Sequence, residues 1–117
     1  MHEIDGTYYL SYSHGGWNLP NYSVHYATAK SPTGPWDYKG AILTSGPTHR
    51  GPGHHSFFKS PANGQWYIAY HYWPTDKVEG PLEGIRQTAI QPVVFGGDGT
   101  IEKVIPTDEG PEAAPIR

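Results

Sequence analysis

The chain has 117 residues, a formal net charge of −3 and no cysteine, which excludes disulfides and thiolate metal sites. Its 8 basic residues do not cluster as a nucleic-acid-binding protein requires, and no apolar run approaches the roughly 20 residues of a membrane-spanning helix. We therefore expect no nucleic-acid partner and no membrane partner. No charged and then apolar leader is recognisable, and the sequence leaves the localisation unknown.

Aromatic residues carry the apolar character of the chain, which favours strands. There are 9 Tyr, 4 Trp and 3 Phe, while 15 Gly and 12 Pro lie mostly between the apolar runs, where they indicate turns. The first half is predicted to form three strands, over residues 7–13, 23–30 and 36–43. After a loop over residues 44–53, the second half is predicted to form four strands, over residues 54–59, 65–73, 85–95 and 100–105.

A repeat relates the two halves. Residues 6–13 (GTYYLSYS) reappear as residues 64–71 (GQWYIAYH), so the offset is 64 − 6 = 58 residues. A full strand at 54–59 precedes the second copy, whereas its counterpart would begin at 54 − 58 = −4, ahead of Met1. Four strands per unit are typical of β-propeller blades. We expect two units of a larger array, the first lacking most of its inner strand; a small β-sandwich formed by duplication is the alternative.

The expected organisation is a single-domain fragment over residues 1–117. It consists of a partial blade over 1–50, a complete blade over 51–107 and a frayed tail over 108–117. Residues 96–99, Gly-Gly-Asp-Gly, predict a tight turn between two strands of the complete blade.

Five motifs carry a resemblance to a known family. In chain order they are Tyr8-Tyr9-Leu10-Ser11-Tyr12-Ser13, Ser31-Pro32-Thr33-Gly34-Pro35-Trp36, Gly51-Pro52-Gly53-His54-His55-Ser56, Arg86 with Gln91-Pro92, and Asp98-Gly99-Thr100-Ile101. Together they resemble the last two blades of glycoside hydrolase family 43, which holds β-xylosidases, α-L-arabinofuranosidases and arabinanases. The resemblance implies an all-β fold that is part of a five-bladed β-propeller.

The resemblance also bears on the catalytic groups. Family members hydrolyse glycosidic bonds with inversion, using an Asp general base, an Asp that tunes a pKa and a Glu general acid. On the resemblance, all three lie outside this chain, so its catalytic residues are unknown, and the remaining candidates are Glu79, Glu83 and Asp5. Glu79-Gly80-Pro81 resembles the surroundings of the family's general acid but is predicted to lie on a loop, and a solvated loop that mimics the motif is the alternative.

Three residues are candidates for substrate binding: Arg86, His54 and Trp73. The resemblance implies that Arg86 reaches the sugar pocket, where its fork of donors suits vicinal hydroxyls or a carboxylate; a surface arginine is the alternative. Trp73, together with Tyr72 and Trp17, offers a flat apolar face for a sugar ring, and core packing is the alternative.

His54 is also the candidate metal ligand. In family members the histidine after Pro-Gly contacts water or a bound cation, often calcium, near the propeller axis. Calcium takes oxygen ligands, so a calcium near His54 would be held mostly by water, and no cofactor is required. A buried histidine bonded to the backbone is the alternative.

The sequence therefore predicts an O-glycosyl hydrolase of plant hemicellulose, acting on β-1,4-xylosides, α-L-arabinofuranosides or both, with an oligo- or polysaccharide as substrate. One alternative is a catalytically inactive carbohydrate-binding fragment. Another is an oligomer whose subunits together build a composite active site. We expect a homo-oligomer, because two blades leave an aromatic-rich flank open and such patches mark interfaces.

Overall fold

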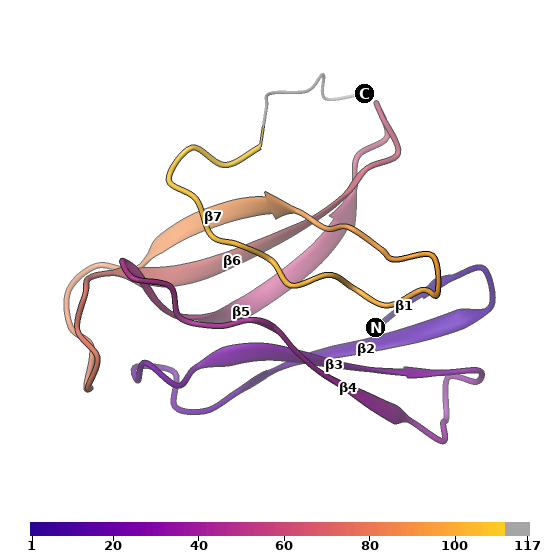
Figure 1. Ribbon diagram of the computed structural model, residues 1–117, viewed down its shortest axis with the longest axis horizontal. Helices are drawn as coiled ribbons and strands as arrows, with labels where there is room; N and C mark the ends of the chain where they lie inside the picture. Colours follow the sequence, from indigo (N-terminus) through magenta and orange to yellow (C-terminus); the bar gives the residue numbers. More distant parts are fainter. Residues whose placement is uncertain (112–117) are drawn as a thin grey trace.

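Seven strands in two antiparallel sheets make up the structure, a computed structural model that describes residues 1–111 (Figure 1). The first sheet contains, in order, β1 (His2–Ile4), β2 (Thr7–His14), β3 (Ser23–Ala29) and β4 (Asp37–Leu43). The second contains β5 (His49–Lys59), β6 (Trp66–Pro74) and β7 (Gln87–Pro92). Residues 1–111 contain no helix, which confirms the expected all-β class. Among these residues there is accordingly no helix long and apolar enough to cross a membrane.

The first sheet follows the predicted strands closely and begins with the short strand β1. Asp5 and Gly6 have φ values of 51° and 83°, and a two-residue type I′ hairpin turn requires two such left-handed conformations. The turn allows β1 to pair with β2, with Glu3 lying opposite Tyr8. The leading strand that the repeat predicts to be largely missing is thus represented by the 3 residues of β1.

The second sheet departs from the prediction at β5, which begins at His49, whereas the predicted strand begins at residue 54. Residues 50–53, rich in glycine and proline, lie inside β5 across a register shift in its pairing with β6. Gly53 is required there because an added Cβ would lie 2.2 Å from the ring of Tyr22. The predicted loop is wrong at this point because glycine and proline, which generally indicate loops, here let a strand bend and approach a neighbouring side chain.

The chain departs from the prediction again after β7, which is shorter than the predicted strand over 85–95. Residues 100–105 form no strand of either sheet, so the second sheet has three strands where four are predicted. Residues 93–105, which we call the strap, instead bridge the two sheets (Figure 1). The turn predicted over residues 96–99 is present, and the N–H of Gly96 donates to the carbonyl of Thr100 at 2.7 Å.

Apolar side chains and hydrogen bonds hold the strap in place. The N–H of Val104 donates to the carbonyl of Ile42 in the first sheet at 2.7 Å, and the N–H of Val93 donates to that of Trp66 in the second at 2.9 Å. Val93, Ile101 and Val104 are all buried. An apolar pattern predicts that a segment is buried but does not predict which element it packs against. The strap is buried between two sheets without joining either one, so its apolar pattern was wrongly interpreted as a strand of the second sheet.

The core lies between the two sheets and the strap. Alternate residues of β3 and β6 point into it, including Val24 and Tyr26 from β3 and Ile68 and Tyr70 from β6. Burying a side chain of this size stabilises the fold by about 1.5–3 kcal/mol. Burial also raises the pKa of Tyr70 to about 12.

Candidate functional site

Six side chains that are distant in sequence meet at one end of the two sheets. We call them the aromatic–arginine cluster, and they are Trp17 and Tyr22 from the loop between β2 and β3, His54 from β5, His71 and Trp73 from β6, and Arg86 from the loop before β7. The loops that follow β2 and β6 lie against each other, since the N–H of Leu82 donates to the carbonyl of Asn18 at 2.7 Å. This contact brings Arg86 to Trp17.

Arg86 rests beside two indole rings. Its Cζ lies 5.4 Å from the ring centroid of Trp17 and 5.7 Å from that of Trp73, within the range of cation–π attraction. The two ring centroids are 6.2 Å apart, and Nε1 of Trp73 donates to the carbonyl of Trp17 at 3.4 Å. Trp73 is only 5% exposed, whereas Trp17 is 55% exposed. Trp73 therefore forms the buried base of the cluster, and Trp17 presents an aromatic face to solvent.

The guanidinium of Arg86 is itself exposed. Within residues 1–111 it makes no hydrogen bond and no ion pair with another side chain. Arginine has five N–H donors in a fixed fork, so two indoles orient this group while its donors remain open to a ligand.

Glu79 and Glu83 lie on the loop that carries Arg86, and both are exposed. The loop is nevertheless well packed, because Leu82 is buried and a Cβ added to Gly80 would lie 2.5 Å from Cδ2 of Leu19. Glu79-Gly80-Pro81 is thus on a loop, as the sequence predicts, and its carboxylate faces solvent at the rim of the cluster.

Asp5 lies at the other end of the first sheet. It is exposed in the turn that precedes β2, whereas Trp17 is in the loop that follows β2, and the 8 residues of this strand span about 26 Å. The structure therefore does not bring Asp5 together with Glu79 or Glu83 within one chain.

Three aromatic rings form a stack beside Arg86. The ring of His71 lies between those of Tyr22, at 5.8 Å and 21°, and His54, at 5.9 Å and 25°. His54 has a left-handed φ of 50°, and its N–H donates to Oγ of Ser13 at 3.0 Å. This strained conformation is fixed by the register shift in β5 and turns the His54 ring outward, so the alternative of a buried His54 does not apply.

Burial lowers the pKa of His71, and the nearby charges of Arg86 and His54 lower it further. Its Nε2 is buried and has no hydrogen-bond partner among residues 1–111. Sequence reasoning missed His71 and Tyr22 as members of the site. The alternation of β6 carries a signal for His71, since it lies two residues before Trp73 and so on the same face of the strand.

The surroundings of His54 fit calcium poorly. Residues 1–111 contain no group of three or more His, Cys, Asp or Glu side chains that could hold a metal ion. The Arg86 cation lies near enough to His71 to lower its pKa and repels a metal, and calcium prefers several oxygen ligands. Calcium near His54 stays a prediction, and no step below uses it.

Comparisons with known proteins agree on one family. The family model described as "Glycosyl hydrolases family 43" matches residues 1–101. β-D-Galactofuranosidase xynD of Aspergillus niger is 36% identical over 114 residues, which cover 96% of this chain and 32% of that protein. A xylosidase/arabinosidase of Bacteroides ovatus is 35% identical over 112 residues, covering 93% of this chain and 30% of that protein.

Solved structures give the same result. A thermostable family-43 glycoside hydrolase superimposes with a TM-score of 0.79 at 30% identity, covering 97% of this chain and 36% of that chain. Structural neighbours of this kind are five-bladed β-propeller enzymes, which confirms the expected partial propeller. The chain spans about a third of the length of these relatives. With a family match over residues 1–101, the chain belongs to glycosyl hydrolases family 43.

Proposed function

We propose that this chain forms a sugar-binding part of a glycoside hydrolase that acts on plant hemicellulose, with β-1,4-xylosides, α-L-arabinofuranosides or both as substrates. The observation that carries the proposal is the pairing of an exposed Trp17 ring with the open donors of Arg86. The names of the relatives support the substrate class, since they include xylosidase and arabinosidase activities.

Four members of the cluster have a direct role in this proposal. The ring of Trp17 packs against the apolar face of a sugar ring, and Arg86 donates hydrogen bonds to adjacent hydroxyls. Trp73, being 5% exposed, acts by holding Trp17 and Arg86 in place. His54, at the exposed end of the ring stack, contacts the substrate from the side.

Hydrolysis with inversion requires two carboxyl groups roughly 6.5–9.5 Å apart across one sugar. Glu79 and Glu83 lie on the rim of the cluster, whereas Asp5 is at the far end of β2. In the proposed enzyme, the carboxyl group that works with Glu79 or Glu83 is not Asp5 of the same chain, and we propose that it comes from further propeller blades or from a second copy of the chain.

The separation of Asp5 from Glu79 and Glu83 favours a second candidate function. The chain by itself would then bind hemicellulose without cleaving it, using the same Trp17 and Arg86. The two functions share the binding site and differ in whether a pair of carboxyl groups is brought to the bound sugar.

We also propose that the chain forms a homo-oligomer. Tyr12 and Tyr38 are 38% and 58% exposed on the first sheet, and Phe58 and Ile90 are 40% and 38% exposed on the second. Apolar side chains on both sheets are available for contact with another copy, and a twofold dimer is the commonest closed arrangement.

Binding and hydrolysis should be measured together on the purified chain. We expect xylotetraose or an arabinoxylo-oligosaccharide to bind, and Arg86→Ala to weaken binding by about tenfold or more, because hydrogen bonds from a charged group contribute about 1.5–3 kcal/mol. Lys77→Ala, which removes a positive charge from the same exposed loop, is the matched control and should bind as the wild type does.

Hydrolysis of nitrophenyl xyloside, arabinofuranoside and galactofuranoside separates the two candidate functions. The enzyme proposal predicts cleavage that Glu79→Gln or Glu83→Gln reduces by about 10²-fold or more. Binding without cleavage supports the second candidate. An absence of binding to all of these sugars contradicts both.

A further inference from the structure

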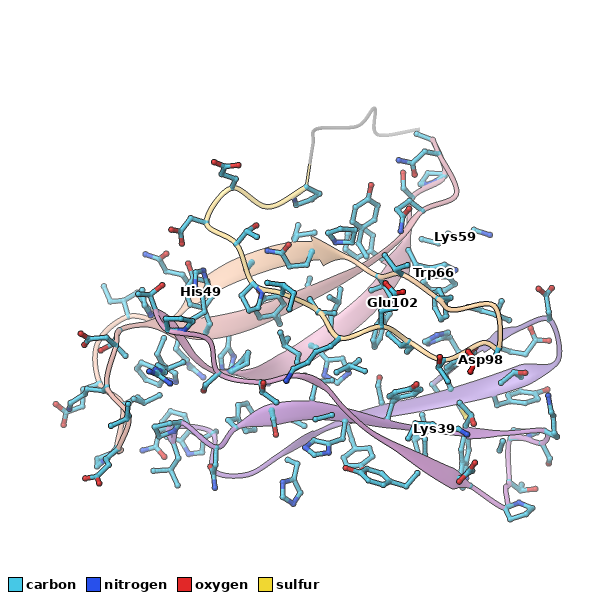
Figure 2. All side chains as sticks on the ribbon, in the orientation of Figure 1. Lys39, His49, Lys59, Trp66, Asp98 and Glu102 are labelled. Carbon is cyan, nitrogen blue, oxygen red and sulfur yellow. The ribbon has the colours of Figure 1, made fainter. Side chains whose placement is uncertain are left out.

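A polar groove lies at the opposite end of the two sheets from the aromatic–arginine cluster. It has a volume of about 440 Å³, and its polar lining includes Thr7, Lys30, Asp37, Lys39, Asp98 and Thr100. Figure 2 shows Lys39 and Asp98 at one end of the molecule and His49 at the other. Because His49 pairs with Pro74, next to Trp73, it marks the end that carries the cluster.

The charged groups of the groove already have partners on its wall. Nζ of Lys39 donates to Oδ2 of Asp37 at 2.7 Å, and Nζ of Lys30 donates to Oγ1 of Thr7 at 3.2 Å. An ammonium group has three donors and a carboxylate has about four acceptor positions. Most of the donors and acceptors in the groove are therefore open to a ligand.

Asp98 stands on a wall that is anchored to the core. The hydroxyl of buried Tyr9 donates to the carbonyl of Gly99 at 2.5 Å. Oδ1 of Asp98 accepts two hydrogen bonds from Thr100, one from Oγ1 at 2.6 Å and one from the backbone N–H at 3.1 Å. These bonds, with a smaller contribution from the positive charge of Lys39, lower the pKa of Asp98, so its carboxylate is ionised and fixed in position.

The charges of the groove balance. Two lysines and two aspartates line it, so it attracts neither anions nor cations strongly. A hydroxyl group both donates and accepts hydrogen bonds, so a neutral ligand rich in hydroxyls can use the ammonium groups and the carboxylates together. The volume lies within the roughly 300–1,000 Å³ of small-molecule sites.

We propose that this charge-balanced groove is a second saccharide site, which binds a neutral oligosaccharide at the end of the sheets opposite the aromatic–arginine cluster. The choice of a xylo-oligosaccharide as its ligand rests on the proposed function. The groove would hold a second stretch of the same polymer chain or a neighbouring chain, while the cluster holds the first.

The test is an NMR titration of the labelled chain with xylotetraose. The amides of Thr28, Lys39 and Gly99 should shift saturably, and they should do so as well in Trp17→Ala/Arg86→Ala, which disables the cluster. Lys30→Ala/Lys39→Ala should weaken binding at the groove by about fivefold or more. Lys59→Ala removes an exposed lysine away from the groove and should leave binding at the groove unchanged. Circular dichroism establishes that each variant is folded.

The outcomes separate this inference from the proposed function. If only amides near Trp17 and Arg86 shift, the second site is wrong and the proposed function stands. If only groove amides shift, the second site stands and the cluster is not a sugar site. If glucuronate shifts the groove amides and xylotetraose does not, the ligand is charged and the inference is overturned. If no neutral sugar shifts either set, both proposals fail.

Discussion

At the scale of single residues, Trp17 and Trp73 look alike in sequence but occupy different environments. Trp73 is 5% exposed and Trp17 is 55% exposed, although both lie beside Arg86. The sequence offers both indoles as a flat face for a sugar ring, and the structure adds that the solvent-facing ring is that of Trp17. A sugar can stack only on the exposed ring.

Alanine substitutions should separate these two roles. Trp73→Ala removes a buried indole and should lower the free energy of unfolding by about 3–5 kcal/mol. Trp17→Ala should lower the free energy of unfolding by the lost cation–π contribution of about 0.5–1 kcal/mol, plus less than about 1 kcal/mol from its other contacts. It should weaken xylotetraose binding about tenfold. Urea denaturation and calorimetry measure the two quantities. Equal loss of stability in both variants would contradict the assigned roles.

His55 should make stability depend on pH. Its Nε2 lies 2.8 Å from Oγ of Ser11, and burial, with smaller contributions from the N-terminal charge and His54, lowers its pKa to about 4. The unfolded chain titrates near the ordinary value of about 6.5. The folded state therefore resists protonation, and stability is full above pH 6.5, falls as pH drops from 6.5 to 4, and levels off below 4.

The size of this loss is up to about 3 kcal/mol, reduced by the partial exposure of the ring. Urea denaturation at several pH values between 7.5 and 4 measures it. His55→Gln should make the pH dependence shallower, leaving the part due to His71, whereas His14→Gln, at an exposed histidine, should preserve it. A His55→Gln profile as steep as that of the wild type would refute the assignment.

At the scale of elements, local sequence signals predicted the strands whose partners are also local. β2, β3, β4 and β6 fall within a residue of their predicted bounds, because alternating aromatic and β-branched residues lie next to clear turns. β5 and the strap were mispredicted because tertiary contacts decide them. The register shift at Gly53 depends on Tyr22, and the strap depends on a space between two sheets.

The candidate site was predictable to a similar degree. The resemblance points to Arg86 and His54, and the sequence offers Trp73, together with Tyr72 and Trp17, as a flat apolar face for a sugar ring. Tyr22 and His71 were not predicted, since a ring stack between a loop, β5 and β6 is set by packing that no local pattern encodes.

Gly53→Ala tests whether β5 positions the site. The added Cβ would lie 2.2 Å from the Tyr22 ring, and overpacking of this kind costs about 1–3 kcal/mol. It should also displace Tyr22 from His71 and weaken sugar binding. Gly97→Ala is the matched control, because an added Cβ there meets nothing within 4 Å. Urea denaturation of both variants should show a loss only for Gly53→Ala, and equal stability of the two would contradict the close approach.

At the scale of the whole molecule, the chain is flatter than a compact domain of its length. Its extents are 41 × 36 × 19 Å and its radius of gyration is 14.7 Å, against about 13 Å for a compact domain of this size. A thin molecule with apolar side chains exposed on both sheets has much surface to cover, which supports the proposed homo-oligomer.

Light scattering at tens of micromolar should therefore give a mass above the 12.9 kDa of one chain. Tyr38→Lys, which places a charge at the most exposed aromatic position of the first sheet, should shift the mass toward the monomer. Lys59→Ala should not. A wild type that remains a monomer at this concentration would contradict the oligomer.

The most direct test of the central claim is a crystal structure of the chain with bound xylotriose or an arabinofuranosyl-xylotriose. The account predicts a sugar ring stacked on the indole of Trp17, with two of its hydroxyls within about 3.2 Å of the Arg86 guanidinium. Sugar bound elsewhere, with Trp17 and Arg86 free of ligand at saturating concentration, would contradict it.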